Sequence, residues 1–377
     1  MNSEFSAVLG GILSPDNNER ARSEGVFRTF KNQDPNQCIR LLVEGLQPGS
    51  GLAVEQRQLS TILLRRTILS EDGYDESEQS FWDTLAPQTQ AGVLGGLLMC
   101  LESESTPLVL KKLYSVISDL ASFLFERSVD WPQLLPTLFK MAGNAQSDVQ
   151  RRSAFEAFSQ LAVGLGAEVF RPMLASVMSM LQAGLRDAQD YKVRLSALSA
   201  TLSFLQIMEQ EDYNAFMQYR ALLPDMLECV TIPIKYGKEV EANASLELFI
   251  ELAEVQPSFF EGELERIIST MLAIARGSDI PEETLRYATE MLITLTESRP
   301  EAMEKVPGYV PAMLDVLLKW MTENEEEDSE WENFEDENEM TNYTAGKEGL
   351  DRLCVALGNE QTQKPFKHSI FFYTLLF

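Results

Sequence analysis

The sequence has a single histidine in 377 residues, and that residue, His368, lies in a C-terminal stretch without helical periodicity. It also lacks a phosphate-binding P-loop, a glycine-rich dinucleotide motif, a nucleophile elbow and the spacings typical of metal sites. Paired acids for acid–base catalysis need one carboxylate held in a dry pocket, whereas most clustered carboxylates here lie in one polar run. The sequence therefore predicts a protein that is not an enzyme and needs no cofactor or metal.

Cysteine and long apolar runs are also scarce. The four cysteines lie far apart in apolar helical contexts, which favours small buried hydrophobic residues over a disulfide framework: Cys38, Cys100, Cys229 and Cys354. No apolar run reaches the roughly 18 residues that cross a bilayer, and Met1 to Leu13 has no basic region typical of a signal peptide. We expect a reducing compartment and no membrane insertion.

Positive charge is underrepresented, with 31 Lys and Arg against 58 Asp and Glu, for a net charge of −27. Eleven of the carboxylates lie in Glu323–Glu339, a run with no Lys or Arg, which leaves −16 on the rest of the chain. Such a charge repels nucleic-acid phosphates and anionic lipid and attracts basic proteins. We therefore expect basic protein partners and no direct nucleic-acid binding.

What the sequence has in abundance is helical periodicity. Tyr191, Leu195, Leu198, Leu202 and Leu205 follow one another at steps of four and three, as on one buried helix face. A proline preceded by bulky residues opens an apolar run at four places, and we expect it to bend the first helix of a unit: Pro136, Pro172, Pro224 and Pro311. Each run is followed by a turn and a second helix.

The repeat length of roughly 40 residues with two helices per unit is typical of HEAT repeats. The sequence predicts an all-α, superhelical solenoid of about eight units, with an acidic loop inside the last one. The expected units span residues 3–32, 34–70, 77–125, 131–165, 169–209, 212–255, 257–298 and 302–358. The expected regions are the N-terminal repeats 1–125, the central repeats 126–322, the acidic loop 323–342, the helix 343–358 and the tail 359–377.

Leu13–Phe27 (LSPDNNERARSEGVF) and Glu55–Leu69 (EQRQLSTILLRRTIL) resemble the first and second repeats of the importin-beta family of karyopherins. The acidic run followed by Ala345–Gly358 (AGKEGLDRLCVALG) is similar to the eighth repeat with its acidic insertion. The resemblance covers about residues 3–358.

The resemblance implies a nuclear import receptor of the nucleus, the cytoplasm and the nuclear pore. Members bind Ran-GTP through the second helices of the first repeats and the acidic insertion. They bind Phe-Gly nucleoporins in grooves between first helices, and they carry cargo on the concave face until Ran-GTP releases it. Family members continue for many more repeats, whereas the pattern here stops after Gly358, so we expect a truncated or alternatively spliced product.

By this resemblance the acidic run and the early second helices are the candidate Ran-binding sites. In the run, carboxylates would clamp a basic surface and two aromatic residues would anchor it; the alternative is a solvated linker. The candidates in the run are Glu323, Glu325, Glu326, Glu327, Asp328, Glu330, Trp331, Glu332, Phe334, Glu335, Asp336, Glu337 and Glu339. The candidates in the early repeats are Glu19, Arg20, Glu24, Arg57, Arg65 and Arg66, for which the alternative is the polar side of an amphipathic helix.

Arginines recur at equivalent places in later units, where HEAT repeats often pair such a residue with an acid of the next unit. We expect a structural ladder from Arg151, Arg152, Arg194 and Arg286. Two other functions stay open: a chaperone for basic proteins such as histones or ribosomal proteins, and an enzyme-assembly scaffold. Import needs nucleoporin binding and chaperoning does not, whereas the scaffold predicts no nucleotide-dependent binding of Ran.

Overall fold

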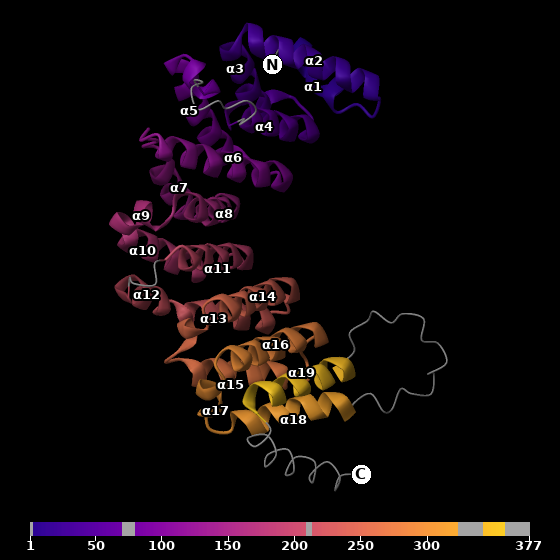
Figure 1. The fold of residues 1–377 in the computed structure, drawn as a ribbon, viewed down its shortest axis with the longest axis vertical. Helices are drawn as coiled ribbons and strands as arrows, with labels where there is room; N and C mark the ends of the chain where they lie inside the picture. The colour runs from indigo at the N-terminus through magenta and orange to yellow at the C-terminus, as the bar shows by residue number, and fades with distance from the viewer. Residues whose placement is uncertain (1–2, 70–79, 209–212, 323–341, 359–377) are drawn as a thin grey trace. The chain divides into compact units, whose positions relative to one another are not determined.

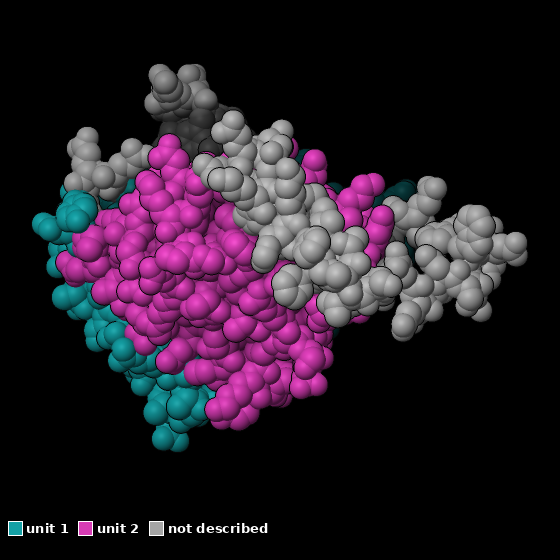
Figure 2. All heavy atoms as spheres, turned by 90° about the horizontal axis from the view of Figure 1, so that it is seen from below, with its two compact units in different colours: residues 1–215 teal, residues 216–377 magenta. Residues whose placement is uncertain are grey.

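The structure, a computed structural model, describes residues 3–69, 80–208, 213–322 and 342–358 (Figure 1). Within these ranges the chain forms helices and turns and no strand. Eight antiparallel helix pairs follow one another in the described residues, which confirms the predicted all-α class and repeat number. The chain divides into two compact units, residues 1–215 and 216–377, which are coloured separately in Figure 2.

Unit 1 contains five of the pairs. Its main helices are α1 (Ser3–Ile12), α2 (Asn17–Gln33), α3 (Pro35–Leu46), α4 (Val54–Leu69), α5 (Pro87–Ser103), α6 (Pro107–Glu126), α7 (Leu134–Ala142), α8 (Asp148–Leu165), α10 (Leu174–Leu185) and α11 (Tyr191–Gln206). The short elements are η1 (Pro48–Ser50), η2 (Phe81–Thr84), α9 (Ala167–Phe170) and η3 (Arg171–Met173). The second helices α4, α6, α8 and α11 pack in series, and so do the first helices α3, α5, α7 and α10.

Unit 2 contains the other three pairs, and α12 (Tyr213–Arg220) crosses the boundary between the units. The pairs are α13 (Leu223–Lys235) with α14 (Glu239–Val255), α15 (Leu264–Ala275) with α16 (Glu282–Ser298), and α18 (Tyr309–Thr322) with α19 (Asn342–Leu357). Two short elements, η4 (Pro257–Phe260) and α17 (Pro300–Glu304), connect them. The second helices α14, α16 and α19 again pack in series.

Local sequence signals account for where the helices begin. Asp34 caps α3 by accepting a hydrogen bond from the Gln37 backbone nitrogen at 2.9 Å, and Pro35 occupies the first turn. Asp190 caps α11 in the same way, with its oxygen 2.7 Å from the Lys192 nitrogen. The caps satisfy backbone donors that have no acceptor within the helix.

The prediction that the recurrent prolines bend the first helices is wrong. Pro136, Pro224 and Pro311 lie in the first turn of α7, α13 and α18, and Pro172 lies in η3, just before α10. Residues of the first turn donate no backbone hydrogen bond within the helix, so proline costs little there and presets the backbone angle. These prolines start the helices.

The predicted apolar stripes form the cores of the pairs. In α11, Leu198, Leu202 and Leu205 are buried, whereas Tyr191 and Leu195 are only half-buried. Cys38, Cys100 and Cys229 are buried and Cys354 is half-buried, and all four are free thiols. Among the described helices none is long and apolar enough to cross a membrane.

Candidate functional site

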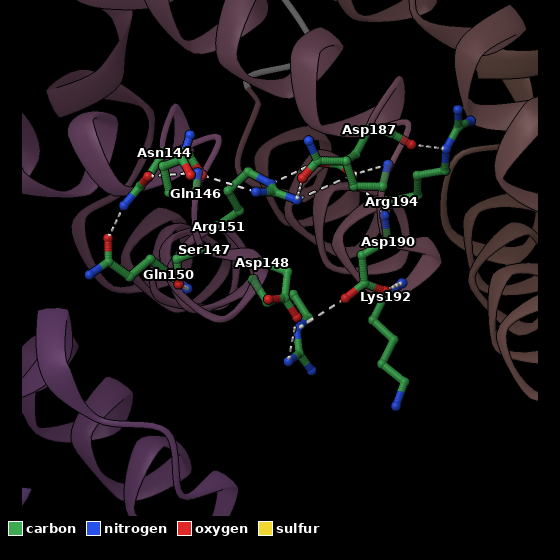
Figure 3. A network of polar contacts seen from close by, with 12 residues as sticks. Asn144, Gln146, Ser147, Asp148, Gln150, Arg151, Asp187, Asp190, Lys192 and Arg194 are labelled. Carbon is green, nitrogen blue, oxygen red and sulfur yellow. Dashed lines mark hydrogen bonds and ion pairs between the residues drawn. The ribbon is translucent and has the colours of Figure 1, made fainter.

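The clearest polar network in unit 1 surrounds Arg151 at the start of α8 (Figure 3). Its guanidinium donates to the carboxylate of Asp187 from Nε at 2.7 Å and from Nη2 at 3.4 Å. It also donates to the Asn144 carbonyl at 2.9 Å and to Gln189 Oε1 at 3.2 Å. Asp187 belongs to the turn after α10, so this buried ion pair joins two consecutive helix pairs.

The other arginines of the expected ladder differ from Arg151 in burial and partner. Arg194 is buried, and its Nε donates to the backbone carbonyl of Asp187 at 2.6 Å (Figure 3). Arg152 is half-exposed and lies 3.4 Å from Asp148 and 3.8 Å from Asp190. In unit 2, Arg286 lies 3.6 Å from Glu282 of its own helix and donates to Asn342 Oδ1 of α19 at 3.2 Å. The four arginines therefore share a position in the repeat but not a set of contacts.

Arg57 of α4 is buried rather than presented to a partner. Its Nε and Nη2 donate to the Leu46 carbonyl at 3.3 and 3.2 Å, and Nη2 contacts the buried carboxylate of Glu104. Glu104 in turn accepts from the backbone nitrogens of Ser105 and Thr106, just before α6. Burial lowers the pKa of Arg57. The contacts of Arg57 therefore hold together the second and third helix pairs.

The remaining early candidates lie nearer the surface. Arg65 is exposed and contacts Asp119 of α6, and Arg66 is exposed. In α2, Glu19 accepts a hydrogen bond from Ser14 Oγ at 2.6 Å, and Arg20 contacts Asn17. Glu24 is exposed. The candidates of the acidic run lie outside the described residues, as do His368 and the tail.

Unit 2 contains a charged surface that was not predicted from the sequence. Five carboxylates of α14, α16 and α19 are exposed or half-exposed, and we call them the acidic face: Glu247, Glu283, Glu290, Glu297 and Glu348. Three of them follow one another at steps of seven along α16, or two helical turns each, which places them on one side of that helix. The spacing of these glutamates can be read from the sequence, but the sequence does not show which helices pack beside α16.

Contacts from neighbouring helices hold two of these carboxylates, Glu247 and Glu283, in place. Glu283 accepts from Asn243 Nδ2 at 3.2 Å, and Glu247 accepts from the hydroxyl of Tyr287 at 2.6 Å. The latter hydrogen bond raises the pKa of Tyr287 to about 12. Asn243 also accepts from Thr284 at 2.6 Å and is buried, so the Asn-Ala-Ser sequence at this position is no glycosylation site in the folded chain.

Arg352 of α19 lies between two of the α16 carboxylates. Its Nε and Nη2 donate to Glu297 at 2.9 and 2.7 Å, and its Nη1 donates to both oxygens of Glu290 at 2.8 Å. These hydrogen bonds raise the pKa of Arg352 and lower the pKa of Glu297. Beside them, α16, α18 and α19 line an open cavity of about 500 Å³.

The first helices of unit 1 form a second depression. A groove of about 450 Å³ lies between α7 and α10, and Phe139 and Met180 line it. Small residues, among them Ala142, Ala175 and Ala183, keep it open. A groove between two helices is a natural pocket for an apolar side chain.

Two protein-family models match the chain. One, described as IPO5-like TPR repeats, matches residues 105–270, and another, described as an importin repeat, matches residues 277–363. Importin subunit beta-3 of Saccharomyces cerevisiae is 24% identical over 241 residues, which are 62% of this chain and 21% of that protein. A probable importin-5 homolog of Dictyostelium discoideum is 21% identical over 355 residues, 93% of this chain and 32% of that protein.

Solved structures of Kap121p share the fold. The structure bound to Nup53p has a TM-score of 0.80 and that bound to RanGTP a TM-score of 0.76, each at 20% identity. Another has Pho4p bound, with a TM-score of 0.79. All three cover 97% of this chain and 34% of Kap121p, so the chain spans about a third of that protein and no more than a third of the curated relatives.

Proposed function

Because this chain belongs to the importin-beta family of karyopherins, we propose that it acts in nuclear import by binding Ran-GTP, Phe-Gly nucleoporins and basic cargo. The family consists of transport receptors, so the chain is a binding protein and not an enzyme. Nuclear import places it in the cytoplasm, in the nucleus and at the pore.

The observation that carries the proposal is the acidic face of unit 2. Its five carboxylates lie on three consecutive second helices, and this row has the charge that a Lys- and Arg-rich segment needs. Kap121p, which shares the fold, binds Pho4p and Ste12p in solved structures. We therefore assign basic cargo to the acidic face.

Ran-GTP is assigned to the early second helices and the acidic run. The exposed Arg65 and Arg66 of α4 and the exposed Glu19 and Glu24 of α2 are available for contact, whereas Arg57 is enclosed and supports its repeat. This assignment of Ran-GTP is supported by Kap121p, which shares the fold and binds RanGTP in a solved structure.

Nucleoporins are assigned to the groove between α7 and α10. Its apolar lining of Phe139, Met180 and several alanines fits one phenylalanine side chain, and its serines fit peptide backbone groups. Kap121p binds Nup53p in a solved structure. Met180→Glu should abolish retention of the chain by an immobilised Phe-Gly peptide, and Arg171→Glu, outside the lining residues, should preserve it.

The decisive experiment is binding of Ran loaded with GTP or GDP at two salt concentrations. We expect a preference for GTP, and weaker binding at high salt because the contacts are charged. A variant with the carboxylates of 323–339 changed to Gln and Asn should bind less tightly. Equal binding of both nucleotide forms by the folded chain would refute transport and favour a chaperone for basic proteins, which the acidic face would serve equally well.

A further inference from the structure

The cavity beside the acidic face combines an apolar floor with a charged rim. Ile293 of α16, Trp320 of α18 and Gly349 of α19 form the floor, and Glu290, Glu348 and Arg352 lie on the rim. Gly349 is required for this shape because a Cβ there would come within 2.9 Å of Ile293 and Leu317. The volume of about 500 Å³ is ample for one long side chain.

One polar group in the cavity has no partner. Thr289 lines it, the residue is 2% exposed, and its Oγ1 makes no hydrogen bond to any described residue. A buried hydroxyl without a partner costs free energy that a bound polar group would restore. The cavity is therefore suited to a guest with an apolar stem and a polar end.

Arg352 itself has an apolar stem and a charged end, and it already binds two carboxylates of the acidic face. Its guanidinium takes up both oxygens of Glu290 and both oxygens of Glu297 at 2.7–2.9 Å. Without Arg352, these two carboxylates, two turns apart on α16, would both be free to bind a cation of a ligand. The exposed Glu348 completes the rim on the α19 side.

We infer that Arg352 is an internal competitor, which occupies a subsite for one cationic side chain between α16 and α19 and weakens binding of basic ligands there. This inference rests on the proposed binding of basic segments to the acidic face. A lysine or arginine of the ligand would contact Glu290, Glu348 and the Thr289 hydroxyl, and its stem would lie over Ile293 and Trp320. Arg352 must then share Glu290 or leave it.

The test measures binding of a fluorescently labelled hexalysine peptide to the whole chain. Arg352→Gln removes the charge and keeps an amide that can hydrogen-bond, and we expect it to tighten binding about three- to tenfold, as for one unit charge removed near the ligand. Arg352→Lys should stay near the unmodified chain. Adding Glu290→Gln and Glu297→Gln to Arg352→Gln should remove the gain in affinity for hexalysine.

Arg276→Gln is the matched control, because Arg276, directly after α15, lies 3.9 Å from Asp315 and does not line the cavity. It changes the net charge equally and should leave affinity within about twofold. Thr289→Val removes only the unpaired hydroxyl, and in the Arg352→Gln background it should weaken binding about two- to fivefold.

Docking of α19 is followed in each variant by the labelling rate of Cys354, the half-buried thiol of that helix. Unchanged or weaker hexalysine binding by Arg352→Gln with α19 docked would overturn the inference while leaving basic-ligand binding in place. Should α19 undock, Arg352→Met provides the same test with a better-packed side chain. If neither the unmodified chain nor the variants bind hexalysine, both the inference and the assignment of basic cargo to this face are wrong.

Discussion

Arg151 and Arg152 are neighbours in sequence, but we expect them to contribute very unequally to stability. Arg151 and Asp187 have side chains 7% and 9% exposed, whereas Arg152 is 33% exposed and its two partners are 50% and 22% exposed. We predict that Arg151→Met lowers the free energy of unfolding by about 3 kcal/mol and Arg152→Met by less than about 1 kcal/mol. Methionine keeps an apolar stem in both variants, so the comparison isolates charge and hydrogen bonds.

The predicted loss in the free energy of unfolding follows from the charge of Asp187, which stays buried when Arg151 is replaced. Removing one partner of a buried pair leaves an uncompensated charge, which costs about 3–5 kcal/mol. Asp187 keeps hydrogen bonds from the backbone nitrogens of Gln189 and Asp190, both at 2.9 Å, so we place the loss at the lower end. The carbonyl of Asn144 also loses its contact with the guanidinium.

Urea unfolding followed by far-UV circular dichroism measures the difference. Because Arg151 joins consecutive helix pairs, its loss should also reduce the denaturant slope if the repeats uncouple. Added salt should change the Arg152 contribution more than that of Arg151, since buried pairs are screened less. A loss below about 1 kcal/mol for Arg151→Met, or equal losses for both variants, would refute the assignment of Arg151 as a brace between repeats.

Three further predictions concern turns, glycines and thiols. Ser128 has a positive φ of 56°, so Ser128→Gly should raise the urea midpoint, by about 0.5–1 kcal/mol in stability. A Cβ on Gly346 would lie 2.9 Å from the Leu317 carbonyl oxygen, whereas nothing lies within 4 Å of one on Gly95; Gly346→Ala should therefore destabilise the chain by about 1–3 kcal/mol and Gly95→Ala stabilise it by about 0.5–1 kcal/mol in the same assay. Burial raises the pKa of Cys38 and of Cys100 from 9.0 to about 12, so their contribution to stability is complete below pH 9 and is lost as pH rises toward 12. A pH titration of the urea midpoint should show this fall, and Cys38→Ala should reduce it; a midpoint independent of pH above 9 would contradict it.

Much of the fold was predictable because its determinants are local. The eight predicted units agree with the eight helix pairs, since the apolar steps of three and four and the turn residues specify each helix within its own stretch. The role of the recurrent prolines was predicted wrongly because a proline this close to a helix start neither removes a hydrogen bond nor bends the helix. Pro136 occupies the first turn of α7, where it removes no hydrogen bond.

The candidate site was less predictable. Arg57 and Arg66 lie on the same helix and were both assigned to a partner surface, yet Arg57 is enclosed against Glu104 and Arg66 is exposed. The two ends of that buried pair are 47 residues apart, and no local pattern connects them. Glu290 and Arg352 are even further apart in the sequence, so neither the acidic face nor the role of Arg352 within it was predicted.

The helical class, the repeat of about 40 residues and the excess of carboxylates can all be read from the sequence, because composition and periodicity do not depend on tertiary packing. Tertiary packing determines which charges are buried as braces, which are exposed, and that Arg352 binds the carboxylates of α16. Burial and pairing depend on the helix that packs opposite. In a repeat protein, that helix comes from a unit about 40 residues away.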